Sequence, residues 1–200
     1  MIVLGLTGSI GMGKSTAAAM LRRLGVPVFD ADLVVHRLLA ASGAAVPPVS
    51  AAFPGVGTED HGIDRVLLGQ RVFTSSAALK RLEAILHPMV AAEEKRFLAR
   101  SRARRVPLVV LDIPLLFETG AERRCDYVLV VSAPALVQRQ RVMRRPGMTE
   151  IRLNTILRKQ MPDHQKRLRA DFVVQTGAHR GLTLRRLKSI VRLLRKRGRG

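Results

Sequence analysis

The sequence predicts an α/β fold in which a parallel five-stranded sheet is flanked by helices. Short apolar runs alternate along the chain with segments of helical periodicity, which is typical of parallel strands covered on both faces. A length of 200 residues suits one domain with inserted lobes. The five predicted strands are residues 2–7, 26–31, 106–113, 126–131 and 170–174.

Some stretches interrupt this alternation. Residues 41–62 are rich in Ala, Pro and Gly and predict a loop between helices. Residues 64–100 contain no strand pattern and predict a small helical lobe inserted into the sheet domain. Residues 138–169 are helical in period apart from Pro146-Gly147, and their arginines suit either a mobile lid over phosphates or a solvated face. The remaining core comprises residues 1–40, 104–137 and 170–200.

The formal net charge of +20, from 35 basic and 15 acidic residues, predicts attraction to nucleic acid, anionic membranes or phosphorylated small molecules. Aromatic residues make up only 4% of the chain, which provides few stacking platforms for single-stranded bases. The single cysteine, Cys125, excludes an intrachain disulfide and a cysteine-rich zinc site. No apolar stretch approaches the roughly 18 residues of a membrane span, and no signal peptide is evident. We therefore expect a soluble, cytoplasmic protein.

The C-terminal segment is strongly basic, with nine Lys and Arg and no acid within residues 179–200. Apolar residues recur at helical spacing within residues 181–194, which predicts a final helix packed against the sheet. The residues expected to face the sheet are Leu184, Leu187, Val191 and Leu194. The arginines would form the outer face, or alternatively bind RNA or a membrane surface. Salt-dependent retention on RNA that falls when residues 195–200 are removed would indicate that alternative.

The segment GSIGMGKST, residues 8–16, directly follows the first predicted strand and opens a predicted helix. It satisfies G-x-x-x-x-G-K-[ST], in which glycines expose backbone N–H groups to phosphates at the positive end of the helix. Lys14 would reach the β- and γ-phosphates, and the Ser15 hydroxyl would bind Mg²⁺. We therefore predict a site for a nucleoside triphosphate. Its predicted ligands are Gly8, Gly11, Met12, Gly13, Lys14, Ser15 and Thr16.

Three classes of protein carry such a phosphate loop: small-molecule kinases, GTPase switches and ATPase motors that work on nucleic acid. The switch is disfavoured because the only asparagine, Asn154, precedes Thr155 and forms no Asn-Lys-x-Asp motif for guanine. The motor is disfavoured because Ile113, not a second acid, follows Asp112 in the third apolar strand. A kinase also needs a group near the γ-phosphate that orients and deprotonates an acceptor hydroxyl.

Two carboxylates, Asp30 and Asp32, close the second predicted strand in the segment FDAD. In an extended strand they would point the same way, and their mutual repulsion would require a nearby cation or substrate. The end of this strand lies beside the phosphate loop in a right-handed βαβ unit, where ligands of open α/β sheets bind. The pair is therefore a candidate for contact with phosphates, magnesium and the acceptor. The alternative is that Asp32 caps a helix beginning at Leu33.

The chain resembles the dephospho-coenzyme A kinases nearly from end to end. Other small kinases share the phosphate loop but not the further motifs, and these motifs carry the resemblance. They are LTGSIGMGKST (6–16), FDADLVVHRL (29–38), GIDRVLLGQRVF (62–73), LHP (86–88), VVLDIPLLFE (109–118), QRQRVMRR (138–145), KQMP (159–162) and ADFVVQTG (170–177).

This resemblance implies transfer of the γ-phosphate of ATP, with Mg²⁺, to the ribose 3′-hydroxyl of dephospho-coenzyme A, the last step of coenzyme A synthesis. It implies that Asp32 is the catalytic base and that Arg141 is a lid arginine meeting the transferring phosphoryl group, with Lys14 as the third catalytic residue. It also implies that residues 64–100 form the helical substrate lobe and that His87 and Asp112 lie at the substrate. Asp30 joins these substrate-binding candidates because of its position at the strand end beside the phosphate loop. A packing role for His87 and a simple ion pair for Glu118 stay open as alternatives. No obligatory nucleic acid is implied; another small-molecule or nucleotide kinase, or a nucleic-acid-stimulated ATPase, is the alternative function.

One position departs from the pattern of the family. After the last strand, the family usually has an asparagine close to the nucleotide base, whereas this chain has Thr176. A threonine offers one donor and weaker geometry than an amide, so adenine contacts are expected to rely more on the backbone.

Overall fold

A computed structural model describes residues 1–73 and 75–198 and divides the chain into two units. The first comprises Met1–Phe29 with Ser101–Gly200, and the second comprises Asp30–Arg100. The second unit therefore begins well before residue 64, where the sequence prediction placed its start. The reason is local: the second strand passes directly into a helix at Ala31, and Leu39 at the end of that helix packs into the core of the second unit.

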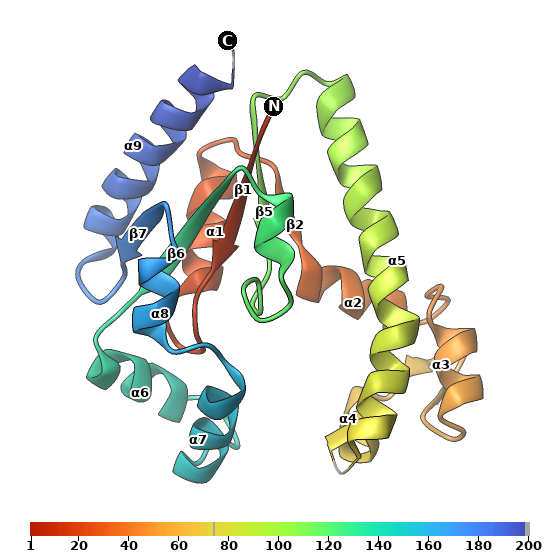
Figure 1. The fold of residues 1–200 in the computed structure, drawn as a ribbon. Coiled ribbons are helices and arrows are strands. Elements are labelled where there is room, and N and C mark those ends of the chain that lie inside the picture. Colours follow the sequence, from red (N-terminus) through yellow and green to blue (C-terminus); the bar gives the residue numbers. More distant parts are fainter. Residues whose placement is uncertain (74, 199–200) are drawn as a thin grey trace. The chain divides into compact units, whose positions relative to one another are not determined.

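A five-stranded sheet organises the first unit, as predicted (Figure 1). The strand order is β2-β5-β1-β6-β7, and β1 pairs in parallel with β5 and with β6, as β6 does with β7. All five predicted strands are confirmed. Their bounds are β1 (Ile2–Thr7), β2 (Val28–Asp30), β5 (Leu108–Asp112), β6 (Tyr127–Ser132) and β7 (Phe172–Gln175).

The two faces of the sheet are covered by different segments, and the alternation of side chains along β6 demonstrates this. Leu129 and Val131 point into the larger core, which they share with helices α1 (Lys14–Arg23) and α9 (Arg180–Arg197). Val128 and Val130 point to the opposite face, where residues from the segments 113–125 and 161–170 cover them. Successive residues of a strand face opposite sides, so burial of both sets explains the uninterrupted apolar sequence.

The remaining helices of the first unit lie between its last strands. They are the 3₁₀ helix η1 (Ala121–Arg124), and α6 (Ala135–Met143), α7 (Glu150–Lys159) and α8 (Asp163–Leu168). The predicted break at Pro146-Gly147 falls between α6 and α7. The final helix is also confirmed, but Leu184, which was expected to face the sheet, is 38% exposed. Within residues 1–73 and 75–198, no helix combines the length and apolarity that crossing a membrane requires.

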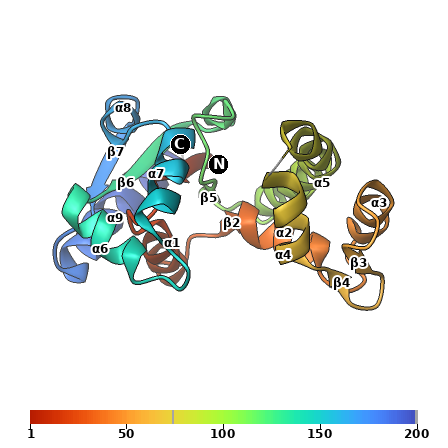
Figure 2. The ribbon, with the colours of Figure 1, turned by 90° about the horizontal axis from the view of Figure 1, so that it is seen from below.

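The second unit is mainly helical (Figure 2). Its buried apolar residues form a core of their own. The stretch 41–62, predicted as a loop, contains a helix and most of a short antiparallel hairpin, because Val46, Val49 and Phe53 bury an apolar face that its Ala- and Pro-rich composition obscures. The elements of this unit are α2 (Ala31–Leu39), α3 (Val46–Ala52), β3 (Gly57–Thr58), β4 (Gly62–Ile63), α4 (Arg65–Phe73) and α5 (Ser76–Ala103), whose last residues belong to the first unit.

A buried ion pair fastens α8 to the segment after β5. The Nζ atom of Lys166, which is fully buried, lies 2.8 Å from Oε1 of Glu118. The same oxygen accepts a hydrogen bond of 2.7 Å from the backbone N–H of Met161. The ion pair considered as an alternative role for Glu118 is thus confirmed. It connects α8, at the C-terminal end of the predicted lid, to the segment that follows β5.

Replacing Lys166 with methionine is expected to lower the free energy of unfolding by about 3–5 kcal/mol, because the carboxylate of Glu118 loses its buried counter-charge. Urea unfolding would measure the change, with Lys188→Met on the exposed face of α9 as the control for loss of one positive charge. Adding Glu118→Gln, which keeps an acceptor for Met161, should recover most of the loss. A single variant as stable as the control would contradict this account.

Candidate functional site

The phosphate loop connects β1 to α1 and presents the N-terminus of α1 without a cap. Gly13, the residue before the helix, has a φ of 88° and makes no side-chain cap, and the first turn of α1 contains no acid. An L-residue with a Cβ rarely adopts this backbone conformation, so the glycine is required for the turn. The uncapped N–H groups and the helix dipole together make an anion site.

Close packing is a second requirement for the glycines of the loop. A Cβ on Gly11 would lie 2.6 Å from Cγ2 of Val142 and 2.9 Å from the carbonyl oxygen of Gln138, both in α6. A Cβ on Gly13 would lie 3.0 Å from Oγ1 of Thr176. The loop is therefore held between α6 and the end of β7, a contact that the sequence motif did not reveal.

Two glutamines hold the peptide groups of Ile10 in the middle of the loop. The side-chain amide of Gln138 donates to the carbonyl oxygen of Ile10 at 2.8 Å, and the backbone N–H of Ile10 donates to Oε1 of Gln160 at 3.0 Å. Gln138 lies in α6 and Gln160 directly follows α7, so two separate parts of the predicted lid fix the loop. Sequence analysis missed both roles, although each glutamine lies in a motif that carried the family resemblance.

Lys14 and Asp112 form an ion pair beside this loop. The Nζ atom of Lys14 donates to Oδ1 of Asp112 at 2.9 Å, and the aspartate side chain is only 2% exposed. The pairing of β1 with β5 explains the contact, since Leu6 is in register with Asp112 and both strands end at the same edge. The structure thus brings together two residues that the sequence predicted to act on phosphate and acceptor.

Arg141 reaches the loop from α6. Its Nη1 atom donates to Oγ1 of Thr176 at 3.0 Å and approaches the carbonyl oxygen of Gly11 at 3.4 Å. Its Nη2 atom donates to the carbonyl oxygen of Thr176 at 2.6 Å. The guanidinium predicted to meet a phosphoryl group is therefore fixed at the phosphate loop by Thr176, the residue that stands where the family usually has an asparagine close to the nucleotide base.

Oxygen ligands suitable for Mg²⁺ are present around Lys14. Ser15 lies exposed in the first turn of α1, and Asp112 provides a carboxylate at the neighbouring strand end. No cluster of three or more His, Cys, Asp and Glu side chains suited to a metal occurs among residues 1–73 and 75–198. Kinase sites commonly bind Mg²⁺ through one or two protein oxygens together with substrate phosphates and water. The donor set of the loop fits that kind of binding.

The other predicted residues, Asp30, Asp32 and His87, belong to the second unit. Asp30 and Asp32 do not continue a strand, as was predicted, because the strand ends at Asp30 and α2 begins at the next residue. Asp30 is the N-cap, accepting from the N–H of Leu33 at 3.0 Å, and Asp32 lies exposed in the first turn. The alternative that an aspartate caps the helix is therefore confirmed, but the capping residue is Asp30 and not Asp32. His87 is exposed on α5, so the alternative of a packing role is not supported.

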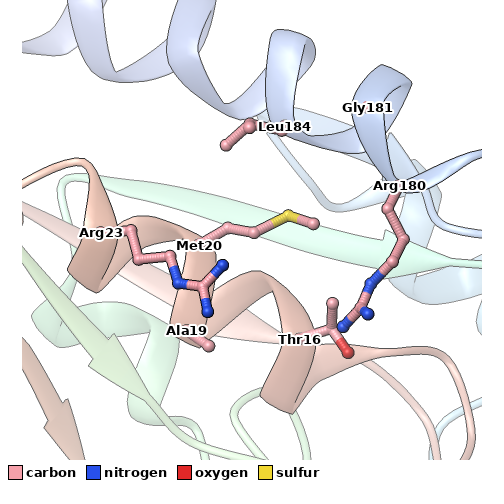
Figure 3. A pocket seen from close by; sticks show the side chains of 7 residues that line it. All are labelled: Thr16, Ala19, Met20, Arg23, Arg180, Gly181 and Leu184. Carbon is pink, nitrogen blue, oxygen red and sulfur yellow. The ribbon is translucent and has the colours of Figure 1, made fainter.

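A pocket of about 300 Å³ lies between α1 and α9, next to the phosphate loop (Figure 3). From α1 it is lined by Thr16, which directly follows the phosphate-loop motif, and from α9 by Arg180, whose guanidinium points toward Thr16 in this view. The other lining residues are Ala19, Met20, Arg23, Gly181 and Leu184. Two arginines with an apolar floor suit a planar group attached to an anion. The partial exposure of Leu184 is explained by its position in this wall.

Comparison with known families gives a match over residues 2–180 to the model of dephospho-CoA kinase. The chain is 64% identical over 195 residues to the dephospho-CoA kinase of Paramagnetospirillum magneticum, an alignment that covers 98% of this chain and 92% of that protein. It is 54% identical over 195 residues to the dephospho-CoA kinase of Rhizobium meliloti, covering 98% and 99% of the two chains.

Solved structures agree on the fold. A Thermus thermophilus protein superimposes with a TM-score of 0.81 at 39% identity, covering 96% of this chain and 97% of the other. A dephospho-CoA kinase from Campylobacter jejuni gives a TM-score of 0.72 at 24% identity, with 97% of each chain covered. The predicted α/β kinase fold is confirmed.

Proposed function

Because the chain belongs to the dephospho-CoA kinase family, we propose that it transfers the γ-phosphoryl group of ATP to the ribose 3′-hydroxyl of dephospho-coenzyme A. The observation that carries this function is the identity of 64% to a dephospho-CoA kinase over nearly the whole chain. The site supports it, since Lys14 and Arg141 both lie at an uncapped helix N-terminus able to hold phosphates. ADP release that depends on dephospho-coenzyme A is the direct test.

The roles of the residues follow from the chemistry of phosphoryl transfer. The bond between the γ-phosphorus and its bridging oxygen breaks, and a bond forms from that phosphorus to the 3′-oxygen of the acceptor. Lys14 and Arg141 would balance the charge on the transferred group, which is the main contribution a protein makes to this reaction. Asp32 would orient the 3′-hydroxyl and take its proton. ADP leaves with the electron pair of the broken bond.

Ser15, with Asp112 nearby, would hold Mg²⁺, which would neutralise part of the charge on the phosphates. Asp112 also holds Lys14 through the 2.9 Å contact of its Oδ1 atom. The aspartate would therefore fix the position of the lysine ammonium group as well as contribute to the metal environment. His87 and Asp30 are proposed to contact the acceptor from the helical unit.

We propose that the pocket between α1 and α9 takes the nucleoside end of ATP. Lys14 is expected at the β- and γ-phosphates, so the nucleoside extends away from it, and Thr16 begins the wall of the pocket. The guanidinium of Arg180 is available to stack on a planar base. This assignment gives ATP recognition to α1 and α9.

Arg180→Ala is expected to raise the KM for ATP by about threefold to tenfold, the range of a partly exposed cation–π contact, with little change in kcat. Steady-state kinetics with varied ATP would measure it. Arg186→Ala removes another exposed arginine from the same helix and should leave the KM unchanged. Equal effects of the two variants would contradict the assignment.

The alternative of a nucleic-acid-stimulated ATPase is less well supported because part of the basic tail has partners within the fold. Nη2 of Arg195 donates to the carbonyl oxygens of Leu24 and Gly25 at 3.0 and 2.7 Å, beyond the end of α1. Nη1 of Arg197 donates to the hydroxyl of Tyr127 at 2.8 Å. The last two residues, 199–200, lie outside the described part of the chain. Loss of RNA retention on deletion of 195–200 would therefore also need a control for stability.

A further inference from the structure

Thr176 is buried and forms hydrogen bonds with the phosphate loop, with the end of β6 and with Arg141. Its side chain is placed by the residue's position directly after β7, and the residue is only 7% exposed. Its hydroxyl lies 2.7 Å from the carbonyl oxygen of Met12 in the phosphate loop and 3.3 Å from that of Ser132. The same hydroxyl oxygen accepts from Nη1 of Arg141 at 3.0 Å.

The hydroxyl has one proton and two lone pairs, and these contacts use both functions. The proton is donated to the closer carbonyl, that of Met12, and a lone pair accepts from Arg141. Because a hydroxyl that donates to a carbonyl becomes a better acceptor, the two bonds strengthen one another. The carbonyl oxygen of Thr176 accepts a further bond of 2.6 Å from Nη2 of Arg141. Thr176 therefore accepts hydrogen bonds from both terminal nitrogens of the Arg141 guanidinium.

We infer that Thr176 is a positioning residue for phosphoryl transfer, which sets the guanidinium of Arg141 against the phosphate loop. The inference rests on the role proposed above for Arg141. Because the Thr176 hydroxyl bonds to both the carbonyl oxygen of Met12 and Arg141, it links the arginine to the backbone of the phosphate loop, which would hold the phosphates. A displacement of the guanidinium by about 1 Å can cost up to a hundredfold in rate, so such a tie has a kinetic consequence.

The surroundings of the Thr176 side chain differ from those expected from the sequence. Thr176 was expected near the nucleotide base, in place of an amide. Its hydroxyl instead points under the loop, where a Cβ on Gly13 would come within 3.0 Å of it. The side chain is engaged by Met12 and Arg141 and is buried, so it acts on the loop and the arginine.

The test compares Thr176→Val, which keeps the shape and removes the hydroxyl, with Thr176→Ser, which keeps the hydroxyl. We expect Val to lower kcat about tenfold with a smaller change in the KM for ATP, and Ser to restore at least half of the normal kcat. Thr183→Val is the matched control, because Thr183 is also buried and its hydroxyl donates to the carbonyl oxygen of Gln175 at 3.1 Å. The control should lower the melting temperature through the loss of one buried hydrogen bond while leaving kcat near normal.

The decisive measurement is a double-mutant cycle between Thr176→Val and Arg141→Ala. If the threonine acts through the arginine, its effect on kcat should shrink to about twofold or less once Arg141 is absent. A tenfold effect that persists without Arg141 would overturn the inference and leave the role of Arg141 intact. Near-normal kcat in Arg141→Ala alone would overturn both. Near-normal kcat in Thr176→Val would overturn the inference alone.

Discussion

Replacement of Lys14 with methionine is expected to lower kcat for phosphoryl transfer by about 10²–10³-fold, the usual cost of removing one preorganised electrostatic contact to a transition state. Methionine keeps the length and apolar stem of lysine but provides no charge. In the structure the ammonium group is fixed 2.9 Å from a nearly buried carboxylate, Asp112, so it is already oriented before a ligand binds. Steady-state kinetics at saturating ATP would measure the loss.

The design of this experiment must separate catalysis from folding. Removing Lys14 weakens the compensation of a buried carboxylate, so activity should be assayed well below the unfolding transition. Lys188→Met serves as the control, because it also removes one positive charge, at an exposed position in α9. A folded Lys14→Met protein with the kcat of the control would contradict the proposed phosphate contact.

The second large effect is expected from Asp32→Asn, which should lower kcat by at least about 10², within the range of a general base. The substitution preserves shape and polarity and removes only the ability to take a proton. The alternative role for Asp32 is structural, since a carboxylate in the first turn of α2 interacts favourably with the helix dipole. That interaction is worth about 0.3–1 kcal/mol of stability and predicts a normal kcat.

Asp64→Asn is the matched control for Asp32→Asn. Asp64 accepts hydrogen bonds from the N–H groups of Val66 and Leu67 at 2.8 and 3.1 Å, at the start of α4 in the same unit. Asparagine caps helices about as well as aspartate, so this variant should retain both stability and kcat. If the two variants had the same kcat, Asp32 would be a helix-terminus residue and another group would have to take the proton.

The elements that the sequence predicted well are those with strong local signals. Uninterrupted apolar runs marked all five strands, and the Pro146-Gly147 pair marked the break between α6 and α7. The phosphate loop was predictable because its glycines and Lys14 have mechanical reasons to occur at fixed spacing. The ion pair between Lys14 and Asp112 was not predicted, because it depends on the adjacency of two parallel strands that end at one edge.

The features that were missed depend on contacts between distant parts of the chain. The hydroxyl of Thr176 bonds to a carbonyl 164 residues away, and Gln160 bonds to an N–H 150 residues away. No local pattern records such partners. The second unit was placed too late because its first helix, α2, begins directly at the end of a strand. Asp30 caps that helix, and the assumption of a continuing strand gave Asp30 and Asp32 the wrong local geometry.

The central claim is the identity of the acceptor, and it can be tested by ADP release from ATP and Mg²⁺ with a panel of acceptors. The panel comprises dephospho-coenzyme A, shikimate, nucleosides, nucleoside monophosphates and RNA, with a reaction lacking any acceptor as the background. We expect release above background only with dephospho-coenzyme A, in equal amount to the coenzyme A formed. Release without an acceptor, or release stimulated by RNA or by another small molecule instead, would contradict the proposed function.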